Sequence, residues 1–224
     1  LLKRNAAVFQ SIISPITHSG FSGIFLVATN PVDIMTQVTY ELSGFNSNRV
    51  FGTGTTLDTA RLRYLLGDYF TVDPRNVHAY VIGEHGDSEI AAWSSANVSG
   101  IPIHDICEMR GFYNHEDAMK EIAETVKNSA YEIIAKKKAT YYGIAMSVRR
   151  ICEALVRNEK SILPVSTMLH GQYGIEDVVL SMPAIVGSDG VETTVPIDLS
   201  PEEQEKLKES ANALAEIAKK LDLE

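Results

Sequence analysis

The chain has 224 residues, of which 45% are hydrophobic and 22% are charged, a composition typical of a globular protein rather than a disordered or coiled-coil one. Its formal net charge of −9 argues against binding to nucleic acid or to an anionic membrane, and no apolar run approaches the roughly 20 residues that span a bilayer. The two cysteines form no CxxC motif and no Cys/His cluster. We therefore expect no metal, no disulfide framework and a cytoplasmic location.

The first part of the chain alternates helix-like and strand-like patterns. It opens with an amphipathic helical pattern whose apolar face is Val8, Phe9, Ile12 and Ile13. Residues 24–28 are a continuous apolar run, typical of a strand buried on both faces, and a helical pattern follows them. Residues 49–51 indicate a second strand, and residues 57–70 a second helix. This order predicts a parallel sheet with right-handed crossovers.

The pattern changes after residue 74. We expect strands over 77–82 and 98–103, then a long helix from about residue 116 that breaks near Thr140. Apolar runs separated by Gly-rich turns are typical of an antiparallel meander, and here they cover 161–169, 178–186 and 191–195. Ser200 and Glu203 form a capping box that begins a C-terminal helix. The predicted class is α/β: the C-terminal part of a doubly wound parallel, Rossmann-type sheet in residues 1–54, then an α+β domain in residues 55–224.

Polar side chains at the ends of these elements are the candidate site residues. Asn30 follows the first strand, where it is either a turn former or a ligand-binding group at the carboxyl end of a sheet. Asp58 and Arg61 share a helix face, either as a surface ion pair or as a fixed guanidinium that binds an anionic substrate. His85 follows a strand and has a glycine on each side, which suits either a loop histidine or an acid/base group.

The dinucleotide fingerprint G-x-G-x-x-G is not complete in this sequence. Gly52-Thr53-Gly54 matches only its first two glycines, and Leu57 stands where the third would be. This stretch therefore favours a tight strand-to-helix turn over a phosphate-binding loop.

Four motifs, taken in order, resemble the bacterial L-lactate dehydrogenases of the lactate/malate dehydrogenase family. Each motif is weak alone, but their order and spacing are specific, and the resemblance extends over the whole chain. The motifs are Thr29-Asn30-Pro31-Val32-Asp33, Leu57-Asp58-Thr59-Ala60-Arg61, Gly83-Glu84-His85-Gly86-Asp87-Ser88 and Ala139-Thr140-Tyr141-Tyr142-Gly143.

The resemblance implies reversible hydride transfer between NADH and pyruvate, which gives L-lactate. It implies that His85 is the acid/base, that Asp58 accepts a hydrogen bond from its other ring nitrogen, and that Arg61 holds the substrate carboxylate. It places Asn30 against the substrate oxygen and the nicotinamide carboxamide, and Thr140 in the substrate pocket. Further neighbours of the nicotinamide would be Val27, Thr53 and Ile144.

The resemblance also implies that three functional parts lie ahead of Leu1: the glycine fingerprint, the acidic ribose-binding residue and a mobile-loop arginine. We therefore expect this chain by itself to be inactive. The residue that best separates lactate from malate dehydrogenases belongs to that loop, so a malate dehydrogenase is the alternative within the family. A non-catalytic fragment or paralogue that serves as an assembly surface is the alternative from another class.

Arg63 and His78 are candidates for an effector site. Arg63 lies two residues after Arg61, roughly on the opposite side of the helix, and His78 lies at odd spacing from His85 along the expected strand. Spacing alone favours a surface cation and a half-buried histidine. The resemblance implies instead that both bind fructose 1,6-bisphosphate at a two-fold interface of a homotetramer.

Overall fold

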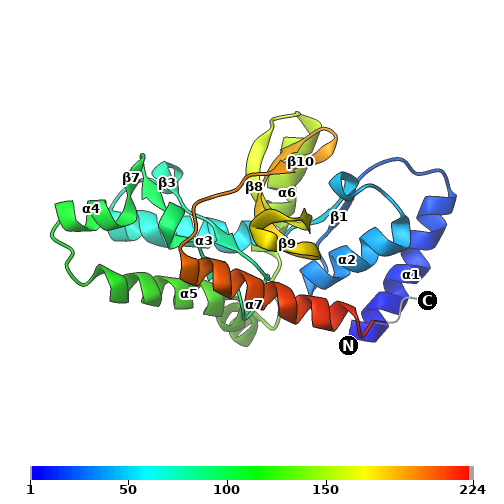
Figure 1. The fold of residues 1–224 in the computed structure, drawn as a ribbon, viewed down its shortest axis with the longest axis horizontal. Helices are drawn as coiled ribbons and strands as arrows, with labels where there is room; N and C mark the ends of the chain where they lie inside the picture. Colours follow the sequence, from blue (N-terminus) through cyan, green and yellow to red (C-terminus); the bar gives the residue numbers. More distant parts are fainter. Residues whose placement is uncertain (1, 222–224) are drawn as a thin grey trace.

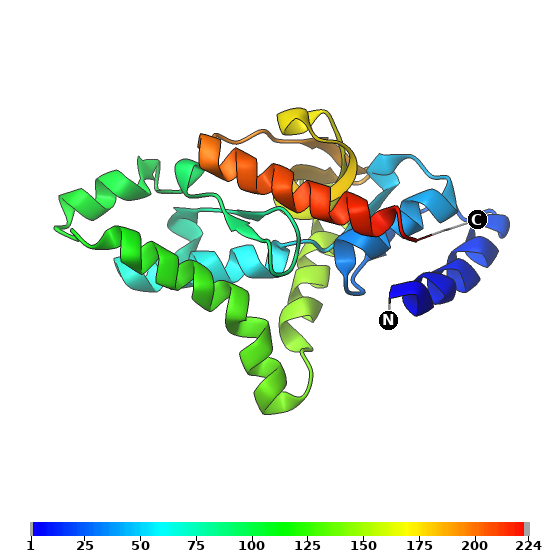
Figure 2. The same ribbon diagram turned by 60° about the horizontal axis from the view of Figure 1, so that its bottom comes forward.

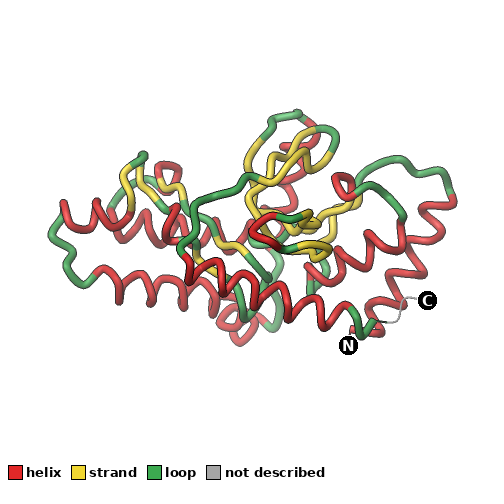
Figure 3. The backbone as a smooth tube through the Cα atoms, in the orientation of Figure 1, coloured by secondary structure: helices red, strands yellow, loops and turns green. Residues whose placement is uncertain are grey.

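One five-stranded sheet joins the beginning and the end of the chain in the computed structural model, which describes residues 2–221 (Figures 1 and 3). Its order is β1 (Phe25–Val27), β2 (Val50–Gly52), β8 (Ser161–His170), β9 (Glu176–Gly187) and β10 (Gly190–Thr194). The first two strands are parallel, as predicted, and the last three form the predicted antiparallel meander. Strand β2 pairs antiparallel with β8 through Gly52 and Ser166. The two predicted sheet regions are therefore neighbours in one mixed sheet.

Helices α1 (Leu2–His18), α2 (Val32–Ser43) and α7 (Pro201–Ala218) share one hydrophobic cluster with this sheet. The predicted capping box of α7 is confirmed, because Ser200 and Glu203 each bond the other's backbone N–H. The predicted apolar face of α1 is wrong in part. Val8 and Ile12 are 48% and 49% exposed, because α1 packs against the rest of the molecule through the face that carries Ala6 and Phe9; Ile13 is buried.

A second layer contains α3 (Thr56–Phe70), α4 (Ile103–Met109) and α5 (His115–Lys137). The predicted strand over 77–82 is wrong: β3 (Val77–His78) and β4 (Val81–Ile82) belong to different small sheets. The strand breaks because side chains of α3 take its backbone groups: Arg63 Nε donates to the Ala79 carbonyl, and Thr59 Oγ1 accepts from the Val81 N–H.

The predicted strand over 98–103 is also wrong. It is a hairpin of β6 (Asn97–Val98) and β7 (Ile101–Pro102), and α4 begins at Ile103. The turn lies at Ser99 and Gly100, which both have positive φ, at 52° and 87°. Strand β6 also pairs with β3, and β5 (Ile90–Ala91) pairs with β4. These short ladders hold the segment around residue 85 between α3 and the main sheet.

The predicted helix break near Thr140 is confirmed. Helix α5 ends at Lys137, Lys138 adopts a left-handed conformation with φ of 67°, and α6 (Tyr142–Val156) follows. Figure 2 shows the end of α5 and the beginning of α6 projecting from the body of the molecule. Between residues 2 and 221, no helix is both long and apolar enough to cross a bilayer.

Candidate active site

The first turn of α3 is fixed against the end of β4. Thr55 Oγ1 donates to the Val81 carbonyl, and Thr59 Oγ1 accepts from the Val81 N–H at 2.9 Å. The turn before this helix requires Gly54, which has a φ of 50° and whose added Cβ would lie 2.5 Å from the Ser166 nitrogen. The backbone thus places Asp58 of α3 next to the loop that follows β4.

Asp58, His85 and Arg61 form a connected cluster at this point. His85 Nδ1 lies 2.7 Å from Asp58 Oδ2, and Arg61 Nη1 lies 3.2 Å from Asp58 Oδ1. The Asp58 side chain is only 4% exposed, whereas those of Arg61 and His85 are 18% and 24% exposed. Because an ionised carboxylate only accepts hydrogen bonds, His85 Nδ1 carries a proton. His85 Nε2 is therefore the ring nitrogen available to exchange a proton with a ligand.

The surroundings of His85 favour its charged form. Burial lowers the pKa of the imidazole, but the hydrogen bond and the charge of Asp58 more than offset this, and the charges of Asp33 and Glu89 add to their effect. The pKa of His85 therefore lies above its ordinary value of 6.5. An imidazolium held in this way can donate a proton near neutral pH.

Asp33 supports the His85 loop, and sequence reasoning gave it no role. Its Oδ2 accepts a hydrogen bond from the His85 backbone N–H at 2.7 Å, and its Oδ1 accepts from Ser166 Oγ at 2.6 Å. Burial raises the pKa of Asp33 to about 6, although both hydrogen bonds lower it. The sequence offered one signal for Asp33, an acidic residue in the first turn of a helix. Its partner Ser166 lies 133 residues farther along the chain, so local patterns do not show the pairing.

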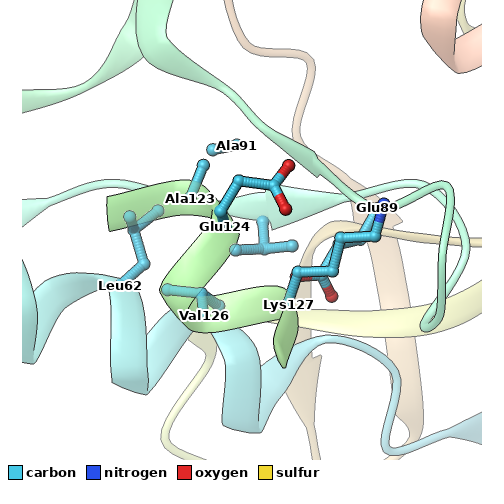
Figure 4. A pocket seen from close by; sticks show the side chains of 8 residues that line it. Leu62, Glu89, Ala91, Ala123, Glu124, Val126 and Lys127 are labelled. Atoms are coloured by element: carbon cyan, nitrogen blue, oxygen red, sulfur yellow. The ribbon is translucent and has the colours of Figure 1, made fainter. Parts of the chain in front are cut away.

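Glu89 is a second carboxyl group that sequence reasoning missed. Burial, and next the charge of Asp58, raise its pKa to about 8. It lines a small cavity of about 70 Å³ between α3 and α5, together with Lys127 and apolar side chains such as Leu62 and Val126 (Figure 4). Ligand atoms of Asp58, His85 and Glu89 lie within 4.8 Å of one another. Both Asp58 oxygens already accept from His85 and Arg61, which makes this cluster a poor cation site.

Val27, Thr53 and Asn30 lie at the carboxyl ends of the parallel strands. The Thr53 N–H donates to the Val27 carbonyl at 2.8 Å, and both residues are buried. Asn30 is exposed and precedes α2, whose first turn carries Asp33. Among the hydrogen bonds of residues 2–221, Asn30 takes part through its carbonyl, which accepts from Asn5, and not through its side-chain amide. That amide is therefore available to a ligand.

Thr140 and Ile144 belong to another part of the chain, at the beginning of α6. Thr140 is exposed in the turn between α5 and α6, and Ile144 is half-buried on α6. Helix α6 begins beside α3, since a Cβ on Gly143 would lie 3.1 Å from the Leu57 side chain. In the described part of the chain, no hydrogen bond joins Thr140 to Asp58, Arg61 or His85.

Arg63 and His78 lie on neighbouring segments outside this cluster. Arg63 Nε donates to the Ala79 carbonyl at 2.9 Å, and its guanidinium lies 4.9 Å from the centre of the Tyr80 ring. His78 is the residue before Ala79 and is exposed. His78 does not share a continuous strand with the segment that leads to His85, because the strand breaks after His78. The hydrogen bond places the Arg63 guanidinium on the carbonyl of the residue that follows His78.

Comparison with known proteins shows similarity to lactate/malate dehydrogenases along the chain. Residues 1–52 match the NAD binding domain of lactate/malate dehydrogenase, and residues 55–223 match its alpha/beta C-terminal domain. An L-lactate dehydrogenase of Acetivibrio thermocellus is 55% identical over 223 residues, which cover 100% of this chain and 70% of that protein. One from Bacillus velezensis is 51% identical over 97% of this chain and 68% of that protein.

Solved structures agree with these sequence matches. The minor L-lactate dehydrogenase of Enterococcus mundtii, in its ligand-bound form, superimposes with a TM-score of 0.94 at 46% identity, over 100% of this chain and 71% of that one. A lactate dehydrogenase from a deep-sea metagenome library gives a TM-score of 0.95 at 46% identity, over 99% of this chain and 70% of that one. The chain therefore belongs to the lactate/malate dehydrogenase family, whose cofactor is NAD.

Proposed function

We propose that this chain carries the acid/base and substrate-binding groups of an L-lactate dehydrogenase, which interconverts pyruvate and L-lactate. The observation that carries the proposal is the hydrogen-bonded cluster of Asp58 and Arg61 on α3 with His85 in the loop after β4, in a chain whose curated relatives are L-lactate dehydrogenases. The chain spans about 70% of the length of these relatives.

In this proposal Arg61 binds the carboxylate of the substrate. A guanidinium has five N–H donors in a planar fork, and Asp58 accepts from one of its nitrogens. The remaining donors can form a two-pronged contact with a carboxylate, which fixes the orientation of the substrate as well as its affinity. Asp58 therefore positions the guanidinium and the imidazole at the same time.

His85 Nε2 holds the proton that moves during the reaction. In pyruvate reduction it donates this proton to the keto oxygen, and in lactate oxidation it accepts the proton of the hydroxyl group. Asp58 stabilises the imidazolium in either direction, and Asp33 holds the backbone of the loop. NAD supplies or takes up the hydride when it is bound.

The residues at the strand ends fit the nicotinamide end of that cofactor. They offer the uncommitted amide of Asn30 and the side chains of Val27 and Thr53, at the carboxyl edge where open α/β sheets bind ligands. The half-buried Ile144 of α6 would add an apolar contact to the ring, and Thr140 would line the substrate side.

The test is a comparison of NADH oxidation with pyruvate and with oxaloacetate, in a protein of the relatives' length that contains this sequence. We expect kcat/KM for pyruvate to be at least about 10²-fold higher, a difference of roughly 2.7 kcal/mol in transition-state binding. A preference for oxaloacetate would make the protein a malate dehydrogenase. No oxidation with either substrate would indicate the non-catalytic alternative.

We further propose that the protein is a cytoplasmic homotetramer activated by fructose 1,6-bisphosphate through Arg63 and His78. Support comes from the hydrogen bond that holds the Arg63 guanidinium on the carbonyl of Ala79, the residue after the exposed His78. Copies of this arginine would repel each other across a two-fold axis until a polyanion bound. Activation should strengthen toward acid pH, where histidine gains charge. The bisphosphate should lower the KM for pyruvate in the wild type and much less in Arg63→Gln. An unchanged wild-type KM between about pH 5.5 and 7.5 would rule out this regulation.

A further inference from the structure

Three successive backbone N–H groups at the start of the His85 loop are bound by three different elements. The Gly83 N–H donates to a carbonyl of β9 at 2.9 Å, and the His85 N–H donates to a carboxylate of α2 at 2.7 Å. Between them, the Glu84 N–H donates to the hydroxyl oxygen of Ser210 on α7 at 3.1 Å. The C-terminal helix therefore holds the residue that immediately precedes His85.

Ser210 also belongs to a closed ring of hydrogen bonds. The Ser88 hydroxyl donates to the Glu84 carboxylate, and the hydroxyl oxygens of Ser88 and Ser210 lie 2.9 Å apart. Because a carboxylate only accepts hydrogen bonds, the Ser88 proton points at Glu84, and Ser210 is the donor to Ser88. The donors thus run from the Glu84 N–H through Ser210 and Ser88 back to the Glu84 carboxylate. His85 lies within the segment that this ring closes.

The position of Ser210 in α7 suits it to hold another segment. A hydroxyl inside a helix can bond the carbonyl one turn earlier, as Ser147 does with Gly143 at 3.3 Å. Ser210 is 1% exposed, and its hydroxyl bonds residues that lie 122 and 126 positions earlier in the chain. Its helix neighbours Leu207 and Leu214 are buried in the cluster that α7 shares with the main sheet. Because this packing fixes α7, the Ser210 hydroxyl is a fixed attachment point for the loop.

We propose that Ser210 is a positioning residue for pyruvate reduction, because it fixes the loop that presents His85 to Asp58. This inference rests on the proposed function, in which His85 Nε2 delivers the proton. The hydrogen bond of 2.7 Å between His85 Nδ1 and Asp58 depends on the direction in which the loop points the imidazole. Ser210 acts on the reaction only through this loop.

Loss of the Ser210 hydroxyl would release the loop at one of its three attachments. The Glu84 N–H would lose its acceptor, and Ser88 would lose its donor. The loop contains Gly83 and Gly86, and glycine restricts the backbone least, so the segment between them could change direction. Small displacements of a group that transfers a proton lower the rate of the reaction. We therefore expect a loss of turnover without a matching loss of substrate affinity.

The first test is hydrogen exchange, measured by mass spectrometry on a protein of the relatives' length. Ser210→Ala should increase the exchange rate of residues 83–88 by about tenfold, because one of their attachments is lost. Ser200→Ala is the matched control, since it removes the N-cap hydroxyl of the same helix and leaves the ring intact. It should destabilise α7 but leave exchange in residues 83–88 unchanged.

The second test is steady-state pyruvate reduction by the same variants. We expect kcat to fall by on the order of tenfold in Ser210→Ala, with KM for pyruvate changed by less than about twofold. Ser200→Ala should keep the wild-type kcat. Because Ser88 and Ser210 act in one ring, adding Ser88→Ala to Ser210→Ala should lower kcat little further.

Unchanged exchange in Ser210→Ala would overturn the proposal, and so would faster exchange with a wild-type kcat. Equal losses of kcat in Ser210→Ala and Ser200→Ala would also overturn it, because stability of α7 would then be the cause. If the wild type reduces no pyruvate, the proposed function fails, and NMR titration of His85 decides the positioning role separately. A lower pKa of His85 in Ser210→Ala would support that role, since the hydrogen bond to Asp58 raises this pKa, and an unchanged pKa would contradict it.

Discussion

The two sides of the candidate active site are built differently. On one side, Asp58 and His85 are buried or half-buried, and the His85 loop is bonded to α2 through Asp33 and to β9 through Gly83 and Ser181. On the other side, Thr140 is exposed in the turn between two projecting helices (Figure 2). Groups that exchange protons need a fixed geometry, and here they are bonded to the sheet, whereas the side expected to cover the substrate lies on a helical hairpin.

A hydrogen bond joins α5 to the His85 loop. The Tyr131 hydroxyl of α5 donates to Asp87 at 3.0 Å, two residues after His85. This contact is exposed and therefore contributes little free energy. We thus expect substitutions on the sheet-bonded side to have larger effects than substitutions on the hairpin.

The largest effect is expected from His85→Asn, in a protein of the relatives' length. Asparagine keeps a polar side chain but cannot exchange the proton, so kcat for pyruvate reduction should fall by on the order of 10²- to 10⁴-fold. Thr140→Ala on the hairpin is the comparison and should cost about tenfold or less, through loss of a single neutral hydrogen bond. Near wild-type turnover in His85→Asn, measured by steady-state NADH oxidation, would remove His85 from the mechanism.

Arg61→Lys should come next. The charge is retained, but an ammonium group cannot make the planar two-pronged contact. We expect kcat/KM for pyruvate to fall by on the order of 30- to 100-fold, equivalent to one charge-assisted hydrogen bond of about 2–2.7 kcal/mol. Arg149→Lys, at an exposed arginine paired with Glu153, is the matched control. If both variants change kcat/KM equally, the carboxylate is bound elsewhere.

Ser166→Ala should destabilise the protein, because it removes the shortest hydrogen bond that the buried carboxylate of Asp33 accepts. The expected cost is about 1.5–3 kcal/mol in the free energy of unfolding at pH 7, measured with urea. Burial raises the pKa of Asp33 from 3.8 to about 6, so between these pH values the folded state holds a proton that the unfolded state has lost. The folded protein therefore loses stability as the pH rises through this range. The loss in Ser166→Ala should therefore be smaller at pH 5 than at pH 7.

Ser147→Ala is the control for this measurement. Ser147 is also buried, but its hydroxyl bonds the Gly143 carbonyl in its own helix, so we expect a cost below about 1 kcal/mol. Equal losses in the two variants, or a loss in Ser166→Ala that does not depend on pH, would show that Asp33 is not held as described.

The smallest effect is expected from Glu89→Gln. Because burial raises the pKa of Glu89 to about 8, the wild-type group is mostly neutral at pH 7, and glutamine resembles that form. Pyruvate reduction should change less than about twofold there. Above pH 8 the ionised Glu89 supports the imidazolium of His85, so the variant should lose activity at a lower pH than the wild type. Glu124→Gln, at an exposed carboxylate on the same cavity, should leave the pH profile unchanged.

Sequence patterns predicted the features that depend on local periodicity. The parallel β1–β2 pair, the meander, the break after α5 and the cap of α7 follow from apolar spacing and turn residues. The prediction of a continuous strand over 77–82 was wrong because backbone groups of that segment bond to Arg63 and Thr59, which spacing along a strand cannot show. Asp33 and Glu89 were missed for a related reason: their roles come from burial and from partners distant in sequence.

The central claim is that Asp58 holds His85 in the state that can donate a proton. NMR titration of the imidazole signals of His85, in the wild type and in Asp58→Asn, tests it most directly. We predict a pKa above 6.5 in the wild type, from the hydrogen bond and charge of Asp58, and a pKa below 6.5 in Asp58→Asn, where burial is the larger remaining influence. The pH at which pyruvate reduction declines should shift in the same direction. A pKa of His85 that is the same in both proteins would contradict the claim.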